Sequence, residues 1–249
     1  MKNSCGIVGL SILCVLCSGL LFSGGQENAS RARSGQRASL FPATQPDVSS
    51  KPPPIRKVAP GVFEVGDVRI FKKENRVEFP ARVNMNKGLL EYVLVSSGGK
   101  LHESLLSTDI EPFHLQIALL MLGLKRSPRP LRWQGDPDTP QGDPVDIWVM
   151  VTKNGRSDKF PAEKWITVRN QAGKFSPMEH RGFIFTGSIV RDGVFVAQMD
   201  RSIVALFHDP TAMFDNPAPE GGNDEVWFVD KQKVMPKGTD VIVSIQKKK

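Results

Sequence analysis

Four residues of types that bind metal ions or transfer protons lie close together in the sequence: Glu91, His102, Glu103 and His114. Imidazole nitrogens and carboxylate oxygens are ligands for divalent metal ions, and both groups act as general acids and bases. Their spacing follows no established metal-binding motif, so two interpretations stay open. In one, His102 and His114 meet a carboxylate such as Glu91 or Asp109 and bind a divalent metal. In the other, which we favour, the same groups form a structural network with buried partners.

Glu91 has an unusual position because it alternates with apolar residues in the segment 89–95, which places its carboxylate on an apolar strand face. A buried carboxylate without a partner is costly. We therefore expect Glu91 to pair with Lys100, Arg82 or a histidine, or to hold a proton. An ion pair that fixes strand register is favoured over an acid/base role.

His102 and Glu103 are neighbours in a segment, 100–105, whose pattern predicts a strand. Alternation directs Lys100 and His102 to one face and Glu103 to the other. The adjacent pair could then bind one metal ion only if the strand were interrupted.

Trp133 is a further candidate because it lies in a proline-rich connection between Lys125 and Pro144, of the kind that often borders binding sites. It could stack on a sugar, whereas Trp148 and Trp227 lie in apolar strand segments and are expected in the core. The ligand-binding candidates are Glu91, Lys100, His102, Glu103, His114 and Trp133. No catalytic residue is assigned, and the Gly-x-Ser-x-Gly motif of serine hydrolases is absent from the sequence.

Apolar alternation with a period of two predicts that most of the chain from Val62 onward is β. Ser96-Ser97-Gly98-Gly99 predicts a tight hairpin between two of the strands. The predicted strands are 62–65, 68–71, 76–79, 89–95, 100–105, 145–151, 183–189, 194–198, 203–207, 225–229 and 240–245.

The main exception is a helix predicted over 111–122, with Asp109 as a cap, Pro112 in the first turn and Gly123 as a stop signal. Its side chains are apolar nearly all round, so we expect it to be buried against the sheet. The sequence also allows a second short helix at about 210–214. The predicted fold class is α+β, predominantly β, with a single domain of antiparallel strands and one buried helix.

Residues 1–25 have the features of a signal peptide: Lys2, an apolar stretch over 6–22 and the small residues Ser23-Gly24-Gly25. An uncleaved membrane anchor is the alternative, because the stretch is close to the minimum length that crosses a bilayer. All three cysteines lie in this segment: Cys5, Cys14 and Cys17. The exported domain would then have no thiol for a disulfide, a nucleophile or an iron–sulfur cluster, and any other cofactor is unknown.

Residues 26–57 are basic and rich in proline and serine without an apolar period, which predicts a disordered tether. The domain is predicted over 58–246 and a basic tail over 247–249. Because these ends carry the net charge of +7, the body of the protein is close to neutral and no nucleic-acid-binding face is predicted. Contact with the membrane is expected only through the N-terminal segment, if it is uncleaved.

Several segments of the chain resemble the YdjY-domain family. They are 82–92, 99–106, His114 with 118–123, 185–188, 209–213 and 236–239, which together extend over nearly all of the predicted domain. The resemblance implies an exported bacterial protein of largely unassigned biochemical role. It also implies cysteines near Asn84 and Val95 in some members and iron–sulfur roles for relatives, a pattern from which this sequence departs.

The combined prediction is a protein of the periplasm or cell envelope that acts as a non-catalytic binding or structural module. Its partner would be a protein or small molecule of that compartment. The alternative is a metal-dependent envelope enzyme that uses Glu91, His102, Glu103 and His114. An enzyme would need these residues to converge in an open pocket, whereas a binding module can leave them mutually satisfied.

Overall fold

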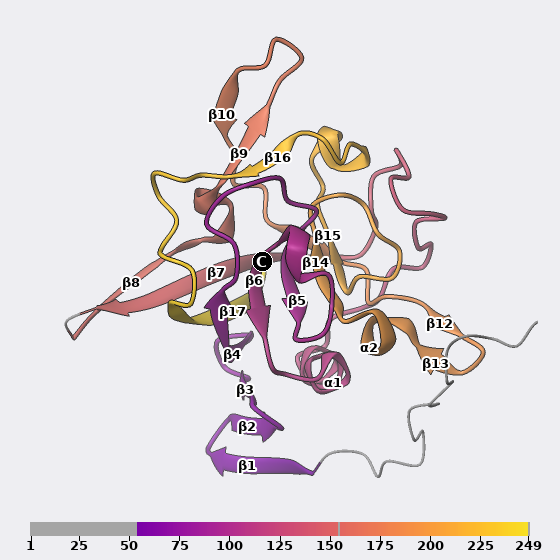
Figure 1. The fold of residues 1–249 in the computed structure, drawn as a ribbon. Helices are drawn as coiled ribbons and strands as arrows, with labels where there is room; N and C mark the ends of the chain where they lie inside the picture. The colour runs from indigo at the N-terminus through magenta and orange to yellow at the C-terminus, as the bar shows by residue number, and fades with distance from the viewer. Residues whose placement is uncertain (1–53, 154, 249) are drawn as a thin grey trace, which may run out of the picture. The chain divides into compact units, whose positions relative to one another are not determined.

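The computed structural model describes residues 54–153 and 155–248 and is a mostly β domain (Figure 1). This agrees with the predicted predominance of strands. The predicted signal peptide, the three cysteines and nearly all of the predicted tether lie outside the described residues. Among residues 54–153 and 155–248, neither α-helix is long and apolar enough to cross a bilayer.

The elements follow one another in this order: β1 Ile55–Ala59, β2 Val62–Val65, β3 Val68–Phe71, β4 Arg76–Val83, β5 Tyr92–Ser96, the 3-10 helix η1 Leu101–Glu103, β6 Ser104–Thr108, α1 Pro112–Met121, β7 Asp143–Lys153, β8 Arg156–Pro161, the 3-10 helix η2 Ala162–Trp165, β9 Ile166–Arg169, β10 Phe175–Pro177, β11 Phe183–Phe185, β12 Val190–Arg191, β13 Val194–Phe195, α2 Val196–Asp200, β14 Ser202–Ala205, β15 Phe214–Asp215, the 3-10 helix η3 Pro219–Gly222, β16 Trp227–Val229 and β17 Asp240–Lys247.

The first strands form the meander that the alternating pattern predicts. β2, β3 and β4 pair antiparallel in sequence order. The turns between them place Gly66 at a φ of 55° and Asn75 at a φ of 51°, a left-handed conformation that glycine and asparagine adopt most readily. In β4 the odd-numbered side chains from Val77 to Val83 are buried, as expected for one face of a strand against a core.

Eight strands close into a barrel in the order β4-β17-β7-β11-β15-β14-β5-β6, and β6 returns to β4. The closing pairs are Arg82 with Ser107 and Val83 with Leu106. The first half of β4 pairs with β3 instead, so β1, β2 and β3 extend from the barrel. Apolar residues of β4, β7, β11 and β17 are part of the core.

The sheet is mixed, which corrects the prediction of antiparallel strands. β5 and β6 are parallel, as are β14 and β15. The expected hairpin at 96–99 is wrong because the chain turns there and then forms η1, which carries it back to the start of β5 before β6 begins. Tyr92 therefore pairs with Ser104 and Ser96 with Thr108.

Helix α1 lies within one residue of its predicted start and end. Glu111 is its N-cap residue, whereas Asp109 was predicted as the cap. Leu115 and Leu119 are buried, while Phe113 and Leu120 on other sides of the helix are exposed.

The prediction of a second helix at 210–214 is wrong. The main-chain N–H and the hydroxyl of Thr211 both donate to Asp209 Oδ1 at 2.8 Å, and this local turn replaces helical bonding. The second helix is α2, which begins at Val196 inside the predicted strand 194–198 and continues to Asp200.

The structure extends the domain beyond both predicted boundaries. β1 begins at Ile55, inside the predicted tether, and β17 continues to Lys247. Lys247 Nζ lies 2.6 Å from Asp143 Oδ2, and Lys248 Nζ lies 3.1 Å from Asp146 Oδ1. Two of the three residues of the predicted basic tail are thus attached to β7.

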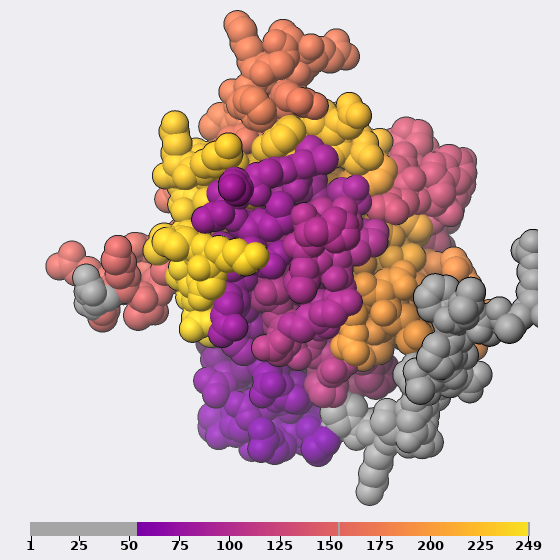
Figure 2. All heavy atoms as spheres, viewed as in Figure 1, coloured from indigo at the N-terminus to yellow at the C-terminus, as the bar shows by residue number. Residues whose placement is uncertain are grey.

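A small sheet with the strand order β10-β9-β16 stands beside the barrel, and β12 pairs with β13. The β9–β10 hairpin projects from the domain at the top of Figure 2. No strand had been predicted for β8, β9 or β10.

Candidate functional site

Five side chains converge beside the start of β5, and we call them the Tyr92 cluster: Glu91, Tyr92, Lys100, Gln134 and Asp209. Lys100 Nζ donates a hydrogen bond of 2.6 Å to the Tyr92 hydroxyl, which donates to Asp209 Oδ2 at 2.7 Å. Gln134 Nε2 donates to Glu91 Oε2 at 3.2 Å. Both Tyr92 and Asp209 are buried.

The backbone explains this convergence. The parallel pairing of Tyr92 with Ser104 returns the chain to the first residue of β5, so Lys100 comes to lie beside Tyr92. Asp209 is held by its own turn, since its second carboxylate oxygen accepts the two bonds from Thr211. The main-chain N–H of Asp209 also donates to Asp215 Oδ1 at 2.9 Å.

Glu91 lies immediately before β5 and is half-buried. Burial raises the pKa of its carboxyl group, and repulsion from Glu103 adds to the effect. Lys100 acts in the opposite direction by attraction. The polar contact of Glu91 is with Gln134. Within residues 54–153 and 155–248, Glu91 forms no ion pair with Lys100, Arg82 or a histidine, which differs from the pairing expected from the sequence.

His102 and Glu103 meet because η1 interrupts the predicted strand. His102 Nε2 lies 3.3 Å from Glu103 Oε2, and the His102 side chain is 79% exposed. The sequence-based expectation that the two side chains face opposite ways is therefore wrong. The structure contains the break in the strand that would allow the two side chains to approach each other.

His114 is not part of this group. His114 belongs to α1, which follows the last residue of β6, whereas η1 precedes the first residue of β6. A strand of five residues is about 16 Å long, so β6 separates His114 from His102 and Glu103. The His114 imidazole packs over Gly66 in the β2–β3 turn, where a Cβ atom would overlap the ring. Across the described part of the chain, no three His, Cys, Asp or Glu side chains are arranged to hold a metal ion.

Two buried acidic groups, Tyr92 in the cluster and Asp215 beside it, favour their protonated forms. Burial raises the pKa of the Tyr92 phenol well above its ordinary value, and the neighbouring Asp209 raises it further. Burial likewise raises the pKa of Asp215, whose Oδ2 atom has no hydrogen-bond partner among the described residues. Within the cluster, the Asp209 carboxylate accepts hydrogen bonds from Tyr92 and from Thr211.

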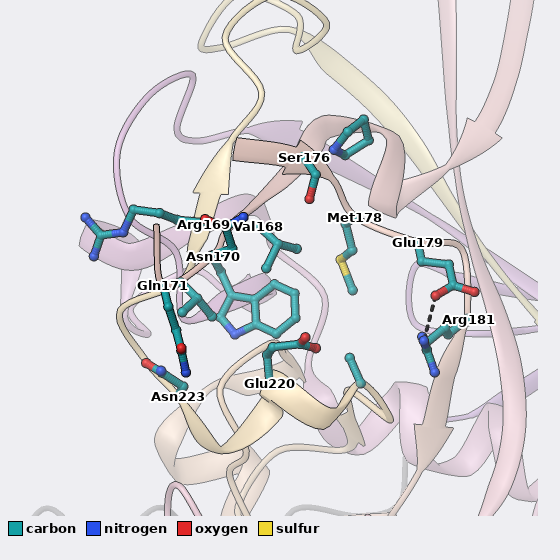
Figure 3. Close-up of a pocket in the computed structure, with 14 residues that line it drawn as sticks. Val168, Arg169, Asn170, Gln171, Ser176, Met178, Glu179, Arg181, Glu220 and Asn223 are labelled. Carbon is teal, nitrogen blue, oxygen red and sulfur yellow. Dashed lines mark hydrogen bonds and ion pairs between the residues drawn. The ribbon is translucent and has the colours of Figure 1, made fainter. Parts of the chain in front are cut away.

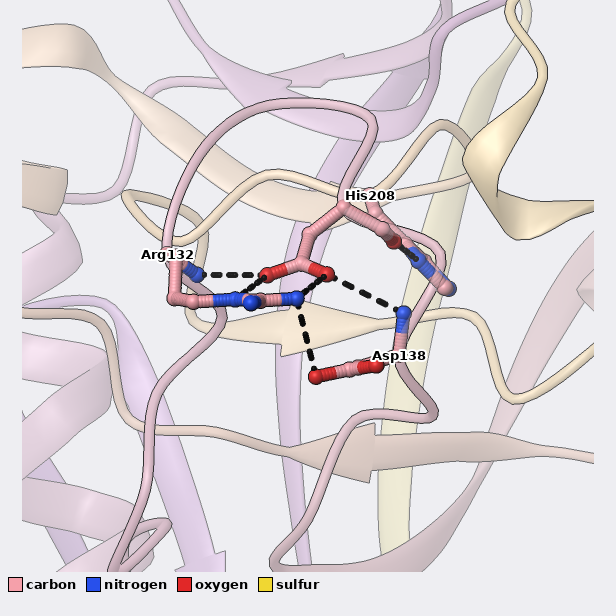
Figure 4. Close-up of polar contacts among 4 residues, drawn as sticks. Arg132, Asp138 and His208 are labelled. Carbon is pink, nitrogen blue, oxygen red and sulfur yellow. Dashed lines mark hydrogen bonds and ion pairs between the residues drawn. The ribbon is translucent and has the colours of Figure 1, made fainter.

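Trp133 is 51% exposed and lies in the proline-rich loop next to Gln134. The Arg132 guanidinium covers one face of its indole, 4.2 Å from the ring centroid. Arg132 is fixed in turn by two bonds of 2.8 and 2.9 Å to the buried carboxylate of Asp136 and one of 3.0 Å to Asp138 (Figure 4). These bonds lower the pKa of Asp136.

His208 anchors the same loop from the core. Its Nδ1 atom lies 2.6 Å from the carbonyl oxygen of Asp136, and its Nε2 atom lies 2.8 Å from that of Asn216. His208 and Asp136 cannot be paired from the sequence because 72 residues separate them and neither lies in a recognisable motif.

Three of the cavities in the described domain have volumes of about 470, 550 and 370 Å³. None of these three is lined by a member of the Tyr92 cluster. The cluster is a hydrogen-bonded network at the start of β5, and Gln134 joins it to the loop that carries Trp133.

Comparison with protein families gives one match, in which the family model described as the YdjY domain covers residues 68–246. No curated protein and no solved structure matches the chain.

Proposed function

The chain belongs to the YdjY domain family, and we propose that it is an exported, envelope-associated binding module that does not catalyse a reaction. The observation that carries this proposal is Trp133, a large aromatic side chain that is exposed and yet fixed in place by the Arg132–Asp136 pair. Aromatic side chains held in this way lose little entropy when a ligand covers them.

The chemistry of Trp133 favours a neutral ring as its ligand. Its indole already has a cation on one face, so a second cation on the open face would be repelled by Arg132. A sugar ring presents C–H groups that pack on an aromatic face and hydroxyls that hydrogen-bond at its edge. Gln134, the next residue in the loop, and its hydrogen-bond partner Glu91 would supply donors and acceptors for those hydroxyls.

The Tyr92 cluster supports a role without catalysis. Lys100 and Asp209 both bond to Tyr92, so the groups that could act as base, acid or nucleophile are already paired. In this proposal the network fixes the surface that carries Glu91 and Gln134.

Calorimetric titration of the full chain with chitotriose and maltotriose tests the proposal. We expect one of these oligosaccharides to bind, and Trp133→Ala to lower its affinity at least about tenfold. Arg132→Lys should weaken binding less, because it keeps the charge but loses the two-point pairing with Asp136. Trp148→Phe is the matched control, since Trp148 packs on His180 instead. Equal affinity of the Trp133→Ala protein, or no binding of either sugar, would contradict the proposal.

A metal-dependent envelope enzyme is the second candidate because His102 and Glu103 lie 3.3 Å apart and both act electrostatically on Glu91. Elemental analysis of the purified protein tests it. A stoichiometric divalent metal that is lost in His102→Ala would favour the enzyme, and its retention in that variant would oppose it.

The exported location is tested separately by cell fractionation. We expect the domain outside the cytoplasmic membrane, where added protease reaches it in spheroplasts. Protection from protease in intact spheroplasts would contradict this part of the proposal.

A further inference from the structure

We infer that the cavity of about 470 Å³ between the β10-β9-β16 sheet and η3 is a second binding site, which takes the free amino end of a short peptide. This site is separate from Trp133 and does not depend on the function proposed above.

The floor of the cavity comes from one face of the small sheet. Val168 is paired with Ser176 on one side and with Trp227 on the other, so these three side chains share a face. All three line the cavity, together with the apolar side chains of Met178, Ala218 and Val226. The floor is therefore apolar, with a hydroxyl at its β10 end.

The opposite face of the sheet has a different character. Phe175 and Phe228 meet edge to face with ring centroids 5.1 Å apart, and the Arg169 guanidinium lies 5.1 Å from the Phe228 ring centroid. Arg169 also donates to the carbonyl oxygen of Glu225 at 2.9 Å. Figure 3 shows its guanidinium pointing away from the other labelled side chains. Its charge is thus directed out of the cavity.

The remaining charges leave the cavity negative. Glu179 and Arg181 neutralise each other in an ion pair of 2.6 Å. Glu220 also lines the cavity, and within residues 54–153 and 155–248 it has no ion-pair partner. Its carboxylate faces the space between the lining side chains in Figure 3. A ligand with an ammonium group would supply the missing cation.

Hydrogen-bond donors surround the rest of the cavity. The Oδ1 atoms of Asn170 and Asn223 accept main-chain N–H groups, which leaves both side-chain NH₂ groups free to donate to a ligand. Gln171 lies beside them. The Trp227 Nε1 donor is buried at the cavity wall with no hydrogen-bond partner among the described residues. A ligand with carbonyl acceptors would match these donors.

The amino end of a peptide combines these requirements. Its ammonium group would pair with Glu220, its carbonyl oxygens would accept from the amide side chains, and an apolar first side chain would pack on Val168 and Met178. An anionic ligand would meet the Glu220 carboxylate, and N-acetylation would remove the charge that Glu220 needs.

Calorimetric titration of the full chain with leucyl-glycyl-glycine and its N-acetylated form tests this inference. We expect the free peptide to bind and the acetylated one to bind about tenfold more weakly, as for the loss of one charge-assisted hydrogen bond. Glu220→Gln should weaken binding of the free peptide by the same factor and remove the difference between the two forms. Glu225→Gln, on the same loop but not lining the cavity, is the matched control and should bind like the wild type.

Equal binding of the free and acetylated peptides, or no binding at a dissociation constant of about 1 mM or tighter, would overturn the inference. An unchanged affinity of the Glu220→Gln protein for the free peptide would overturn it as well. Trp133→Ala should leave peptide binding intact, so failure here and failure of the sugar-binding proposal can be told apart.

Discussion

Lys100 Nζ lies 2.6 Å from the hydroxyl of Tyr92, the only tyrosine in the chain. The same hydroxyl donates to Asp209, so one phenol joins a lysine near the surface to a buried carboxylate. Because no other tyrosine contributes, the ultraviolet absorption of tyrosinate reports on this one contact.

We expect no tyrosinate absorption from the native protein until alkali unfolds it. Burial and Asp209 raise the pKa of Tyr92, so the folded state holds the phenol proton at a pH where the unfolded chain, with an ordinary pKa of about 10, releases it. This contribution to stability is complete below about pH 10 and is lost as the pH rises above it. Absorbance and circular dichroism should therefore change together. A tyrosinate signal that precedes unfolding would contradict the buried contact.

Tyr92→Phe should lower the free energy of unfolding by about 1–3 kcal/mol, since it leaves Asp209 and Lys100 without their shared partner. Urea denaturation measures this change. If the contact is the cause, the double variant with Lys100→Met should lose less than the sum of the two single changes. Additive losses would show that Lys100 and Tyr92 are not coupled.

Asp215→Asn should make the stability of the protein less dependent on pH. Burial raises the pKa of Asp215, so its proton contributes stability that is complete below the ordinary aspartate pKa of about 4 and is lost as the pH rises through the folded-state pKa. Asparagine is never ionised and can still accept the N–H of Asp209. We expect the melting temperature of the variant to be higher than that of the wild type at pH 8 and slightly lower at pH 4. Thermal denaturation at the two pH values measures this.

Asp240→Asn is the control for this measurement, because Asp240 is an exposed partner of Arg82. It should retain the pH dependence of the wild type. Parallel curves for Asp215→Asn and the wild type would mean that Asp215 is ionised in the fold.

Gly221→Ala should destabilise the protein by about 1–3 kcal/mol, because a Cβ atom there would overlap the ring of His208. The imidazole is fixed by two carbonyl oxygens and has little room to move. Gly222→Ala is the matched control, since a Cβ atom at that position meets only ordinary contacts. Equal melting temperatures for the two variants would contradict this packing.

Strands with a regular alternating pattern can be predicted from the sequence. The way in which two strands pair cannot, where it depends on the conformation of the turn between them. The β2–β4 meander follows from alternation and from Gly66 and Asn75, which are local signals. Residues 96–99 have the composition of a hairpin, yet the parallel pairing of Tyr92 with Ser104 depends on contacts with β4 and β14 that the local sequence does not encode.

The candidate site was predictable only in part, for a related reason. Glu91, Lys100, His102 and Glu103 are close in sequence, and the structure keeps them close. His114 follows β6 and is carried to its far end. Asp209 and Gln134 join the cluster through the barrel and the loop, at separations of 117 and 43 residues from their partners. Contacts between residues so far apart cannot be predicted from a single sequence.

The place of β17 in the barrel affects the order in which the protein can fold. This strand lies between β4 and β7 and pairs with both along nearly its whole length. The barrel therefore cannot close until residues 240–247 have left the ribosome, and the contacts formed last are those of greatest sequence separation. During synthesis the earlier strands remain without their central neighbour. Until then the edges of β4 and β7 that bond to β17 have no partner strand.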